Sequence, residues 1–567
     1  MWFAKIKRIF VRRGMRRGGE IDPDEILLDG ANLPAFDVYQ FEGRLEKAIS
    51  KISVISAGIF LLLVGALFGA RIWHLQIAEG ALYEAKSEAN RLRHTLVFAE
   101  RGIISDRNKN LLAWNIPSAK ETQFSLRRYA PIDGVGNLLG YVKYPSKDSA
   151  GFYYREDFIG LDGLEKTYND KLGGQNGLKI TETDALNKIQ SESVLRPPKD
   201  GESLTLSIDS GLQSAMFKFI KELANSSKFT GGAGVIMDVK TGELVVLTTY
   251  PEYQSQVLTD GDDSAKIATL VNDKRTPFLF RTIAGLYTPG SIVKPFVALG
   301  ALQENVIDPS TKILSTGSIS IPNQYDPTKK STFRDWRAHG WVDMRQALAV
   351  SSDVYFYEIG GGFESQPGLG ISRIDKYVSL FGLGSDVPGE MFNGTAGTIP
   401  NPEWKADNFE DKTWRVGDTY NTAIGQYGFQ VTPLQIVRAI GAVANGGKLF
   451  DPQIIRSETP AQFLQIPIDE KHYAVVREGM RQAVLMGTTQ ALNVLQVEVA
   501  GKTGTAELGT TKSFVNSWVT GFFPYRDPHY AFAVIMEKGP VANLVGAAYV
   551  MRQFLDWLYQ NAPEYLE

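Results

Sequence analysis

The sequence predicts a membrane-anchored protein of mixed α/β class, in which an antiparallel sheet flanked by helices stands on an α+β module. Three observations support this prediction. Residues 52–70 form one uncharged apolar run, residues 71–228 mix short strand-like and helical segments, and residues 229–567 begin and end with β-rich runs separated by helical stretches. Strands at the two ends of the last region must meet in one sheet, which brings distant segments together.

The composition permits more than one folded domain and gives no reason to expect a nucleic-acid partner. The chain has 567 residues, 43% of them hydrophobic, and a formal net charge of -3. It contains no cysteine, which excludes disulfide bonds and thiolate metal sites and fits an exported protein.

The apolar run at residues 52–70 predicts a transmembrane helix, since it is long enough to cross a hydrocarbon layer of about 30 Å. Lys51 and Arg71 bracket it, and Trp73 lies at the expected interface. These flanks disfavour a buried core helix, and the late start and missing cleavage site disfavour a signal peptide. Cations before the run place the N-terminus in the cytoplasm and the chain from about Arg71 onward outside. They are Lys5, Lys7, Arg8, Arg12, Arg13, Arg16 and Arg17.

Residues 1–51 are expected to form a cytoplasmic tail, basic up to Arg17 and acidic and mixed from Glu20 to Glu46. Two interpretations of the basic part remain open. Its apolar residues alternate with cations, as in an amphipathic face that binds anionic lipid. A disordered basic tail explains the same composition. The apolar residues are Trp2, Phe3, Ile6 and Phe10.

Ser291-Ile-Val-Lys294 predicts an activated serine nucleophile. Pro289-Gly290 indicates a turn, and the apolar stretch from Ile292 to Gln303 has helical character, which places Ser291 near a helix N-terminus. Residues three apart on a helix share one face, so Lys294 is placed to be the base that a serine hydroxyl needs. A second cation, Lys502, would favour the uncharged form of that base, and the helix dipole would favour an oxyanion.

Later elements are needed to support this site, because Ser-x-x-Lys is expected about once or twice by chance in such a chain. Lys-Thr-Gly occurs twice. Lys240-Thr241-Gly242 lies between two β-rich runs and predicts a hairpin turn. Lys502-Thr503-Gly504-Thr505 lies between the strand-like runs Leu495 to Val499 and Ser513 to Phe522. It predicts a pocket-lining edge strand on which Gly504 lets a substrate backbone approach.

Three motifs follow one another in the order of a known family: Ser291-Ile-Val-Lys294, Ser351-Ser352-Asp353 and Lys502-Thr503-Gly504-Thr505. This set resembles that of the penicillin-binding proteins and serine β-lactamases. Further sequences resemble class B penicillin-binding proteins, whose pedestal signatures are absent from ordinary β-lactamases, and the similarity covers roughly residues 50–560. They are Arg101-Gly-Ile-Ile-Ser-Asp-Arg-Asn108, Gly160-Leu-Asp-Gly-Leu-Glu-Lys-Thr-Tyr168, Leu206-Ser-Ile-Asp-Ser-Gly-Leu-Gln213, Gly425-Gln426 and Thr432-Pro433-Leu434-Gln435.

The resemblance implies a serine D,D-transpeptidase of cell-wall synthesis that needs no cofactor. Ser291 would attack the carbonyl of the penultimate D-alanine in a peptidoglycan stem peptide, Lys294 would accept its proton, and terminal D-alanine would leave. An amine on a neighbouring stem would then take the acyl group. β-Lactam antibiotics would bind covalently to the same serine.

The other motif residues receive roles by the same resemblance. Ser351 would pass a proton between Lys294, Lys502 and the leaving nitrogen. Lys502 would also bind the substrate carboxylate by its charge, together with neighbouring hydroxyl groups. The substrate-binding residues would be Thr503, Gly504 and Thr505, and the backbone N–H groups of Ser291 and Thr505 would form the oxyanion hole.

Asp353 stands where many members of the family carry asparagine. An ionised aspartate only accepts hydrogen bonds, and beside Lys294 it favours the ammonium form, which opposes a free-base lysine. By resemblance, elongation-type members, the penicillin-binding protein 2 group, often tolerate aspartate here. Together with Trp336 and His339-Gly340, Asp353 favours the elongation type over the division enzyme.

The resemblance also implies a location and partners. The protein would be a single-pass protein of the bacterial inner membrane, with a pedestal at residues 71–228 and an extracytoplasmic transpeptidase domain at residues 229–567. Only Leu111 to Gly160 separate the first two pedestal signatures, so the head subdomain of relatives is expected to be reduced or missing. The module is too short for a glycosyltransferase domain. Expected partners are stem peptides, β-lactams, a SEDS-type membrane glycosyltransferase and cell-shape scaffold proteins.

Asp335, His339 and Asp343 have the helical spacing of metal ligands, but a metal is not expected without a cysteine or second histidine in the segment. Arg101 and Asp106 are expected to pair inside the pedestal.

Aromatic residues of the catalytic region have two explanations. Trp414, Tyr420 and Tyr427 would either shape the substrate cleft or pack in the core. A final amphipathic helix is expected from about Ala542 to Tyr559.

Other functions remain alternatives. A D,D-carboxypeptidase uses the same residues with water as the acceptor. A β-lactamase would need a general-base motif of the class A type, which the middle region lacks. Intact motifs argue against a silent scaffold, and a β-lactam-sensing receptor would need an intracellular signalling module that the short N-terminal segment does not provide.

Overall fold

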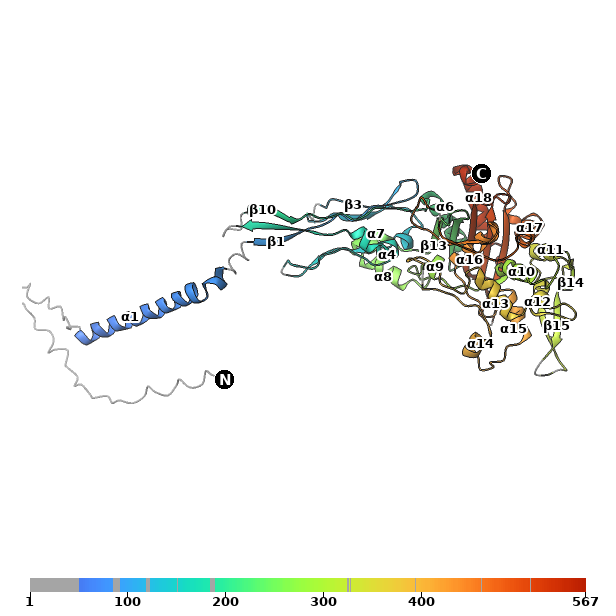
Figure 1. Ribbon diagram of the computed structural model, residues 1–567, viewed down its shortest axis with the longest axis horizontal. Helices are drawn as coiled ribbons and strands as arrows, with labels where there is room; N and C mark the ends of the chain where they lie inside the picture. The colour runs from blue at the N-terminus through green and yellow to red at the C-terminus, as the bar shows by residue number, and fades with distance from the viewer. Residues whose placement is uncertain are drawn as a thin grey trace, which may run out of the picture. The chain divides into compact units, whose positions relative to one another are not determined.

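A computed structural model describes residues 50–84, 92–118, 123–149, 151–183, 189–323, 326, 328–392, 394–459, 461–509 and 511–567 (Figure 1). The chain divides into two units, Met1–Arg91 and Leu92–Glu567, and each is described by itself. Both interpretations of the basic tail concern residues outside the described ranges.

The described part of the first unit is mainly one long apolar helix, followed by a further helical turn at residues 80–84. Helix α1, Lys51–Trp73, begins at Ser50, whose side chain accepts a hydrogen bond from the Ser53 N–H, and it continues as the short π-helix η3, His74–Ala78. None of its side chains is buried within the protein. Over Lys51–Ala78 the mean hydropathy reaches 2.4, so length and composition suit a membrane span.

The second unit begins with a strand-rich module, as expected. One antiparallel sheet has the order β1-β9-β10, and a second sheet has the order β11-β2-β3-β4. Three short helices lie between strands of this module: α3 Gly136–Leu139, α4 Gly163–Thr167 and α5 Asn169–Gly173. The strands are β1 Leu92–Val97, β2 Ile104–Ser105, β3 Leu111–Ile116, β4 Leu126–Tyr129, β9 Gly177–Thr183, β10 Ile189–Arg196 and β11 Leu204–Thr205.

The predicted pairing of Arg101 with Asp106 is wrong. Arg101 donates from Nε to Glu165 Oε2 at 2.6 Å, and Arg127 donates from Nε to Glu165 Oε1 at 2.8 Å. Glu165 lies on α4, Gly163–Thr167, and all three side chains are buried. Asp106 instead accepts bonds from Asn110 and Ser210. Arg101 and Asp106 therefore belong to two separate hydrogen-bond networks, although they lie in the same sequence signature.

The catalytic region is built on a five-stranded sheet of order β13-β12-β22-β21-β20. β12 and β13 form a hairpin, and β12 also pairs along its whole length with β22, which confirms that strands from both ends of the region meet. Lys240-Thr241-Gly242 forms the hairpin turn, as predicted. The strands are β12 Gly231–Asp238, β13 Leu244–Tyr250, β20 Ala500–Leu508, β21 Phe514–Phe523 and β22 Tyr530–Pro540.

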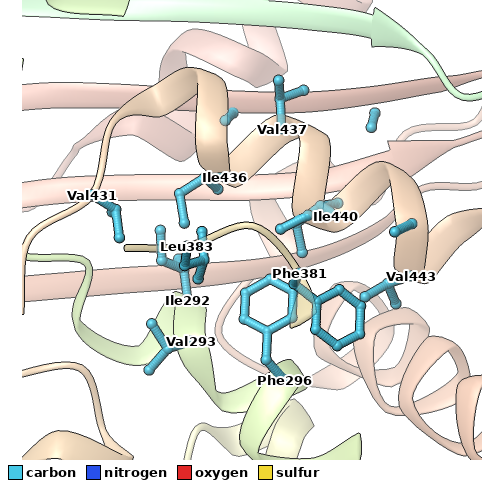
Figure 2. Close-up of a cluster of buried hydrophobic side chains, with 14 of the residues drawn as sticks. Ile292, Val293, Phe296, Phe381, Leu383, Val431, Ile436, Val437, Ile440 and Val443 are labelled. Atoms are coloured by element: carbon cyan, nitrogen blue, oxygen red, sulfur yellow. The ribbon is translucent and has the colours of Figure 1, made fainter. Parts of the chain in front are cut away.

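Helices cover both faces of this sheet. α6, Ser210–Ser227, and α18, Ala547–Asn561, pack with one face in a common apolar cluster. α16, Pro433–Ala444, is buried throughout and contacts the other face. Figure 2 shows Ile436, Ile440 and Val443 of α16 facing Phe296 and Phe381, whose ring centroids are 4.9 Å apart. The predicted boundary at residues 228–229 stays a prediction.

Two element boundaries differ from expectation. Leu495 to Val499 is a loop rather than a strand, with Leu495 fully exposed, and the strand begins at Ala500 and contains the whole Lys-Thr-Gly motif. The last helix begins at Ala547 rather than near Ala542. Asn543 before it is tied to the chain of α6, because its side chain donates to Ser227 O at 2.7 Å.

Glu252 links the catalytic sheet to the pedestal module. It follows β13, and its two carboxylate oxygens accept the backbone N–H groups of Gly134 and Gly136, each at 2.6 Å. Burial raises the pKa of Glu252 to about 7, because it outweighs these two hydrogen bonds.

The Glu252 carboxyl predicts a pH dependence of stability. A raised carboxyl pKa means that the folded state binds the proton more tightly than the unfolded state, so this contribution is full below about pH 4.5 and is lost as pH rises through 7. We expect the wild-type midpoint of thermal unfolding to fall relative to Glu252→Gln between pH 5 and pH 8. The free-energy change is at most about 3 kcal/mol. Nearby Asp133 and Lys221 are the same in both proteins. Parallel pH curves would contradict this interpretation.

Candidate active site

Ser291 lies in a tight turn that leads directly into a helix. Gly290–Val293 forms the 3-10 turn η4, and α10, Lys294–Gln303, continues from it. The predicted turn and helix are confirmed, although Ser291 is in the 3-10 turn and Lys294 is the first α-helical residue. Gly290 has a φ of +57°, in the left-handed region that favours glycine.

Gly425 contacts the turn that contains Ser291. Its carbonyl accepts the Gly290 N–H at 2.9 Å. A Cβ atom on Gly425 would lie only 2.2 Å from Gly290 O, and its φ is +76°. The absence of a side chain at Gly425 therefore allows its backbone to approach the backbone at Gly290, directly before Ser291.

This close approach predicts a strong effect of Gly425→Ala. The left-handed conformation alone costs about 1–2 kcal/mol for a residue with a Cβ, and the clash forces the Ser291 turn to move. We expect a lower unfolding midpoint and an acylation rate with penicillin reduced about tenfold or more. Gly261→Ala is the matched control, because Gly261 has a φ of +67° but a Cβ added there would have no atom within 4 Å. Equal effects of both substitutions would count against a supporting role for Gly425.

The Lys294 amine is buried and held by the middle motif. Its Nζ donates to Asp353 Oδ1 at 2.6 Å and to Ser351 O at 2.9 Å, and lies 3.4 Å from Ser351 Oγ. Lys294 has no exposed side-chain area, whereas 18% of the Asp353 side chain is exposed. Lys294 and Asp353 therefore form an ion pair at the site.

The Lys502 amine lies on the other side of the same hydroxyl. Its Nζ is 2.6 Å from Ser351 Oγ and donates to Thr503 O at 2.9 Å. Burial, together with the charge of Lys294, holds the pKa of Lys502 well below its usual value, against the opposing effect of Asp353. The Ser351 hydroxyl thus lies between the amines of Lys294 and Lys502, and burial favours the neutral form of Lys502.

Ser351 has a constrained backbone. It ends α11, Met344–Val350, with a φ of +58°, and Ser352 then caps α12, Asp353–Gly361, by accepting the Tyr355 N–H at 3.3 Å. A non-glycine residue in the left-handed region is strained and must be held by its surroundings. The break between the two helices aims the Ser351 hydroxyl at both lysines.

The motif strand β20 is the edge strand of the sheet, as predicted. Thr503 and Thr505 face the cleft, and Thr503 Oγ1 donates to Thr488 Oγ1 at 2.7 Å. Gly504 is buried, and a Cβ there would lie 2.6 Å from Pro289 O, so its missing side chain admits the Ser291 turn. The expected approach of a substrate backbone at Gly504 stays a prediction.

A cleft of about 1040 Å³ contains Ser291, Ser351 and Asp353 with the two threonines of β20. Lys502 is completely buried beneath it, so the expected direct contact of Lys502 with a substrate carboxylate stays a prediction. Residues that sequence reasoning missed also line the cleft. They are Thr332, Arg334, Asn421, Thr488, Glu507 and Lys512; none belongs to a motif, and only the fold brings them near Ser291.

Asp335, His339 and Asp343 have helical spacing in the sequence, but they do not lie on one helix. The first two lie in the connection between β16, Lys330–Arg334, and β17, Gly340–Val342. Asp343 caps α11 by accepting the Gln346 N–H. Among the described residues no three metal-ligating side chains gather.

The aromatic residues of the catalytic region pack with one another. Tyr420 is buried against Phe333, with ring centroids 5.0 Å apart. Tyr427 packs between the rings of Trp404, Phe409 and Trp414. Core packing therefore accounts for Tyr420, whereas Trp414 and Tyr427 belong to a half-buried aromatic cluster that includes the exposed Phe409.

Comparison with known proteins agrees with the geometry. Residues 232–556 match the family described as the penicillin binding protein transpeptidase domain. The chain belongs to this family. Residues 120–206 match the penicillin-binding protein dimerisation domain, the module called the pedestal above. The resemblance to class B penicillin-binding proteins of the elongation type is confirmed.

Named relatives of this family align over most of their length. The chain is 28% identical to the peptidoglycan D,D-transpeptidase MrdA of Haemophilus influenzae, over 94% of this chain and 95% of the relative. It is 26% identical to MrdA of Escherichia coli K12, over 88% and 92%.

Solved structures of penicillin-binding proteins are also similar to this chain. Penicillin-binding protein 2 (PBP2) of Pseudomonas aeruginosa, in complex with WCK 5153, is 28% identical with a TM-score of 0.69, covering 84% of this chain and all of that one. A complex of PBP2 and MreC from Helicobacter pylori gives 27% identity and a TM-score of 0.69, covering 83% of this chain and 99% of that one.

Proposed function

We propose that this chain is an elongation-type peptidoglycan D,D-transpeptidase that forms an acyl-enzyme at Ser291. The decisive observation is that three motifs, spread over more than 200 residues, meet around one hydroxyl: Ser351 Oγ lies between the amines of Lys294 and Lys502. The relatives named D,D-transpeptidase and the matched transpeptidase domain support the same reaction.

The charges of the site suggest an order for the proton transfers. Asp353 forms an ion pair with Lys294, and burial lowers the pKa of Lys502. A proton moves from Lys294 through Ser351 Oγ to Lys502, and the neutral Lys294 then accepts the proton of Ser291 as Oγ attacks the carbonyl carbon. This relay carries the proton from the amine that pairs with Asp353 to an amine whose pKa burial lowers, so it needs the negative carboxylate of the substrate near Lys502.

The cleft supplies the groups that hold the substrate. The Thr503 and Thr505 hydroxyls bind the terminal carboxylate, and the charge gained by Lys502 beneath them strengthens this contact. Backbone N–H groups of Ser291 and Thr505 stabilise the oxyanion. When the C–N bond breaks, Ser351 returns a proton from the lysine pair to the departing D-alanine amine.

The anchor helix and the relatives support a location and partners. We place the N-terminus in the cytoplasm of a bacterium and the transpeptidase domain outside the inner membrane, as the cations before α1 favour. The Helicobacter pylori relative forms a complex with MreC, which supports a cell-shape scaffold as a partner. A SEDS-type glycosyltransferase would supply the glycan strands.

Mass spectrometry after labelling tests the nucleophile. The full-length protein in detergent is incubated with a labelled β-lactam and digested, and we expect one adduct, on the peptide containing Ser291. An adduct on another residue, or none, would overturn the assignment.

A second assay separates transpeptidation from the carboxypeptidase alternative. A stem pentapeptide is supplied with and without an amine acceptor, and we expect a cross-linked product when the acceptor is present. Release of D-alanine without any cross-linked product would favour the carboxypeptidase.

A further inference from the structure

Asp335 carries a buried carboxylate directly behind the middle motif. Its side chain has no exposed area. Oδ1 accepts the Trp336 N–H at 2.8 Å, and Oδ2 accepts the Val354 N–H at 3.0 Å and the Ser352 hydroxyl at 2.8 Å. The carboxylate therefore ties the connection after β16 to the first turn of α12.

Both oxygens of Asp335 must be acceptors. Each one faces a backbone N–H, which is a donor whose direction is fixed by the chain. Asparagine offers one acceptor oxygen and one NH₂ group. In either orientation its NH₂ group would face a backbone N–H and leave that donor unsatisfied. The position therefore requires a carboxylate rather than a residue of similar shape.

Two donors of Asp335, Ser352 and Val354, lie beside the residues that hold the lysines. The other donors are the Trp336 N–H and the Ser315 hydroxyl, which lies 3.3 Å from Oδ2. Ser352 and Val354 flank Asp353, which pairs with Lys294. Ser351, next to Ser352, accepts the Lys294 amine at its carbonyl and lies between the lysines at its hydroxyl. A shift of the Ser352–Val354 backbone would thus move both partners of Lys294 together.

Asp335 is ionised in this environment. Burial opposes its charge, but hydrogen bonds from Val354 and Ser352 and the charge of Lys294 hold its pKa below the usual value. His339 Nε2 lies 3.4 Å from Oδ1. The titratable groups that interact with Asp335 are Lys294, His339 and Tyr357, and Arg337 interacts with His339.

We infer that Asp335 is a positioning residue of the acyl-transfer site: its carboxylate fixes the strained Ser351–Asp353 turn relative to the two lysines. This inference rests on the proposed function. It gives a task to a residue to which the sequence alone assigned no role. Asp335 acts through Ser352 and Val354.

The test measures acylation of the full-length protein in detergent by a fluorescent penicillin over a range of concentrations. For Asp335→Asn we expect the acylation rate at saturation to fall at least tenfold, with the concentration for half-maximal rate changed less than threefold. Loss of the negative charge beside Lys294 should also move the acidic limb of the pH–rate profile to lower pH. Ser352→Ala removes one donor to Asp335 and the side-chain cap of α12, and it should give a smaller loss of rate with no shift of the limb.

Asp343→Ala is the matched control. Asp343 caps α11, the helix that ends before Ser351, and contacts none of the donors of Asp335. It should lower the unfolding midpoint and leave the pH profile in place. The inference is overturned if folded Asp335→Asn acylates at the wild-type rate, or if its losses match those of Asp343→Ala with an unchanged pH profile. Failure of wild-type protein to label at Ser291 would instead refute the proposed function.

Discussion

Lys502→Met is expected to abolish acylation and to stabilise the protein. The Lys502 amine is completely buried, and burial lowers its pKa strongly, so the folded state bears a cost for holding it. Methionine has a similar volume and no charge. The unfolding midpoint should rise by about 2–4 °C, and the acylation rate should fall by about a thousandfold, because the proton relay loses its acceptor.

The first Lys-Thr-Gly sequence provides the control for this experiment. Lys240 has the same local sequence but lies in a hairpin turn, with its side chain 48% exposed and paired with Asp527. Lys240→Met should leave both the rate and the midpoint close to wild type. Fluorescent penicillin labelling and thermal unfolding measure the two quantities. A Lys502→Met protein that acylates normally would remove Lys502 from the mechanism.

Glu165→Gln is expected to cause the largest loss of stability. Glu165 is the sole carboxylate between the buried guanidinium groups of Arg101 and Arg127 in the part of the chain described by the structure. Burial opposes its charge, but both arginines hold the pKa of Glu165 below its usual value. Removing the charge leaves two buried cations without compensation, which costs about 3–5 kcal/mol.

Denaturant unfolding of Glu165→Gln beside Glu222→Gln measures this effect. Glu222 also pairs with a cation, Lys218 at 4.0 Å, but its side chain is 53% exposed, so its loss should cost less than about 0.5 kcal/mol. Folded Glu165→Gln should still label with penicillin, because Glu165 lies in the pedestal. Similar losses for both variants would mean that the buried cluster contributes no more than a surface pair.

Motif order and chain topology made the main features of the site predictable. The spacing of Ser291 and Lys294 placed them at one helix start, and the surroundings of each Lys-Thr-Gly separated the hairpin from the catalytic strand. The meeting of the terminal strands followed from the need to complete one sheet. These features depend on local pattern or on a general rule of architecture.

The features that failed depend on tertiary contacts. Leu495 to Val499 has a strand-like composition but no partner strand, and Arg101 selects a glutamate 64 residues away. Asp335 and His339 have helical spacing in a segment that is not helical. The buried position of Lys502 was also hidden, because one lysine in an edge strand gives no signal of what covers it.

The pairing of β12 with β22 has a consequence for how the protein is made. Gly231 lies opposite Glu537, so the central pair of strands forms only after nearly the entire polypeptide has been synthesised. Until then the β12–β13 hairpin exposes one unpaired edge and two apolar faces, which is a template for aggregation. Such long-range pairing also forms slowly. A nascent chain therefore needs protection by chaperones until residues 530–540 arrive, and penicillin labelling should appear late in biosynthesis.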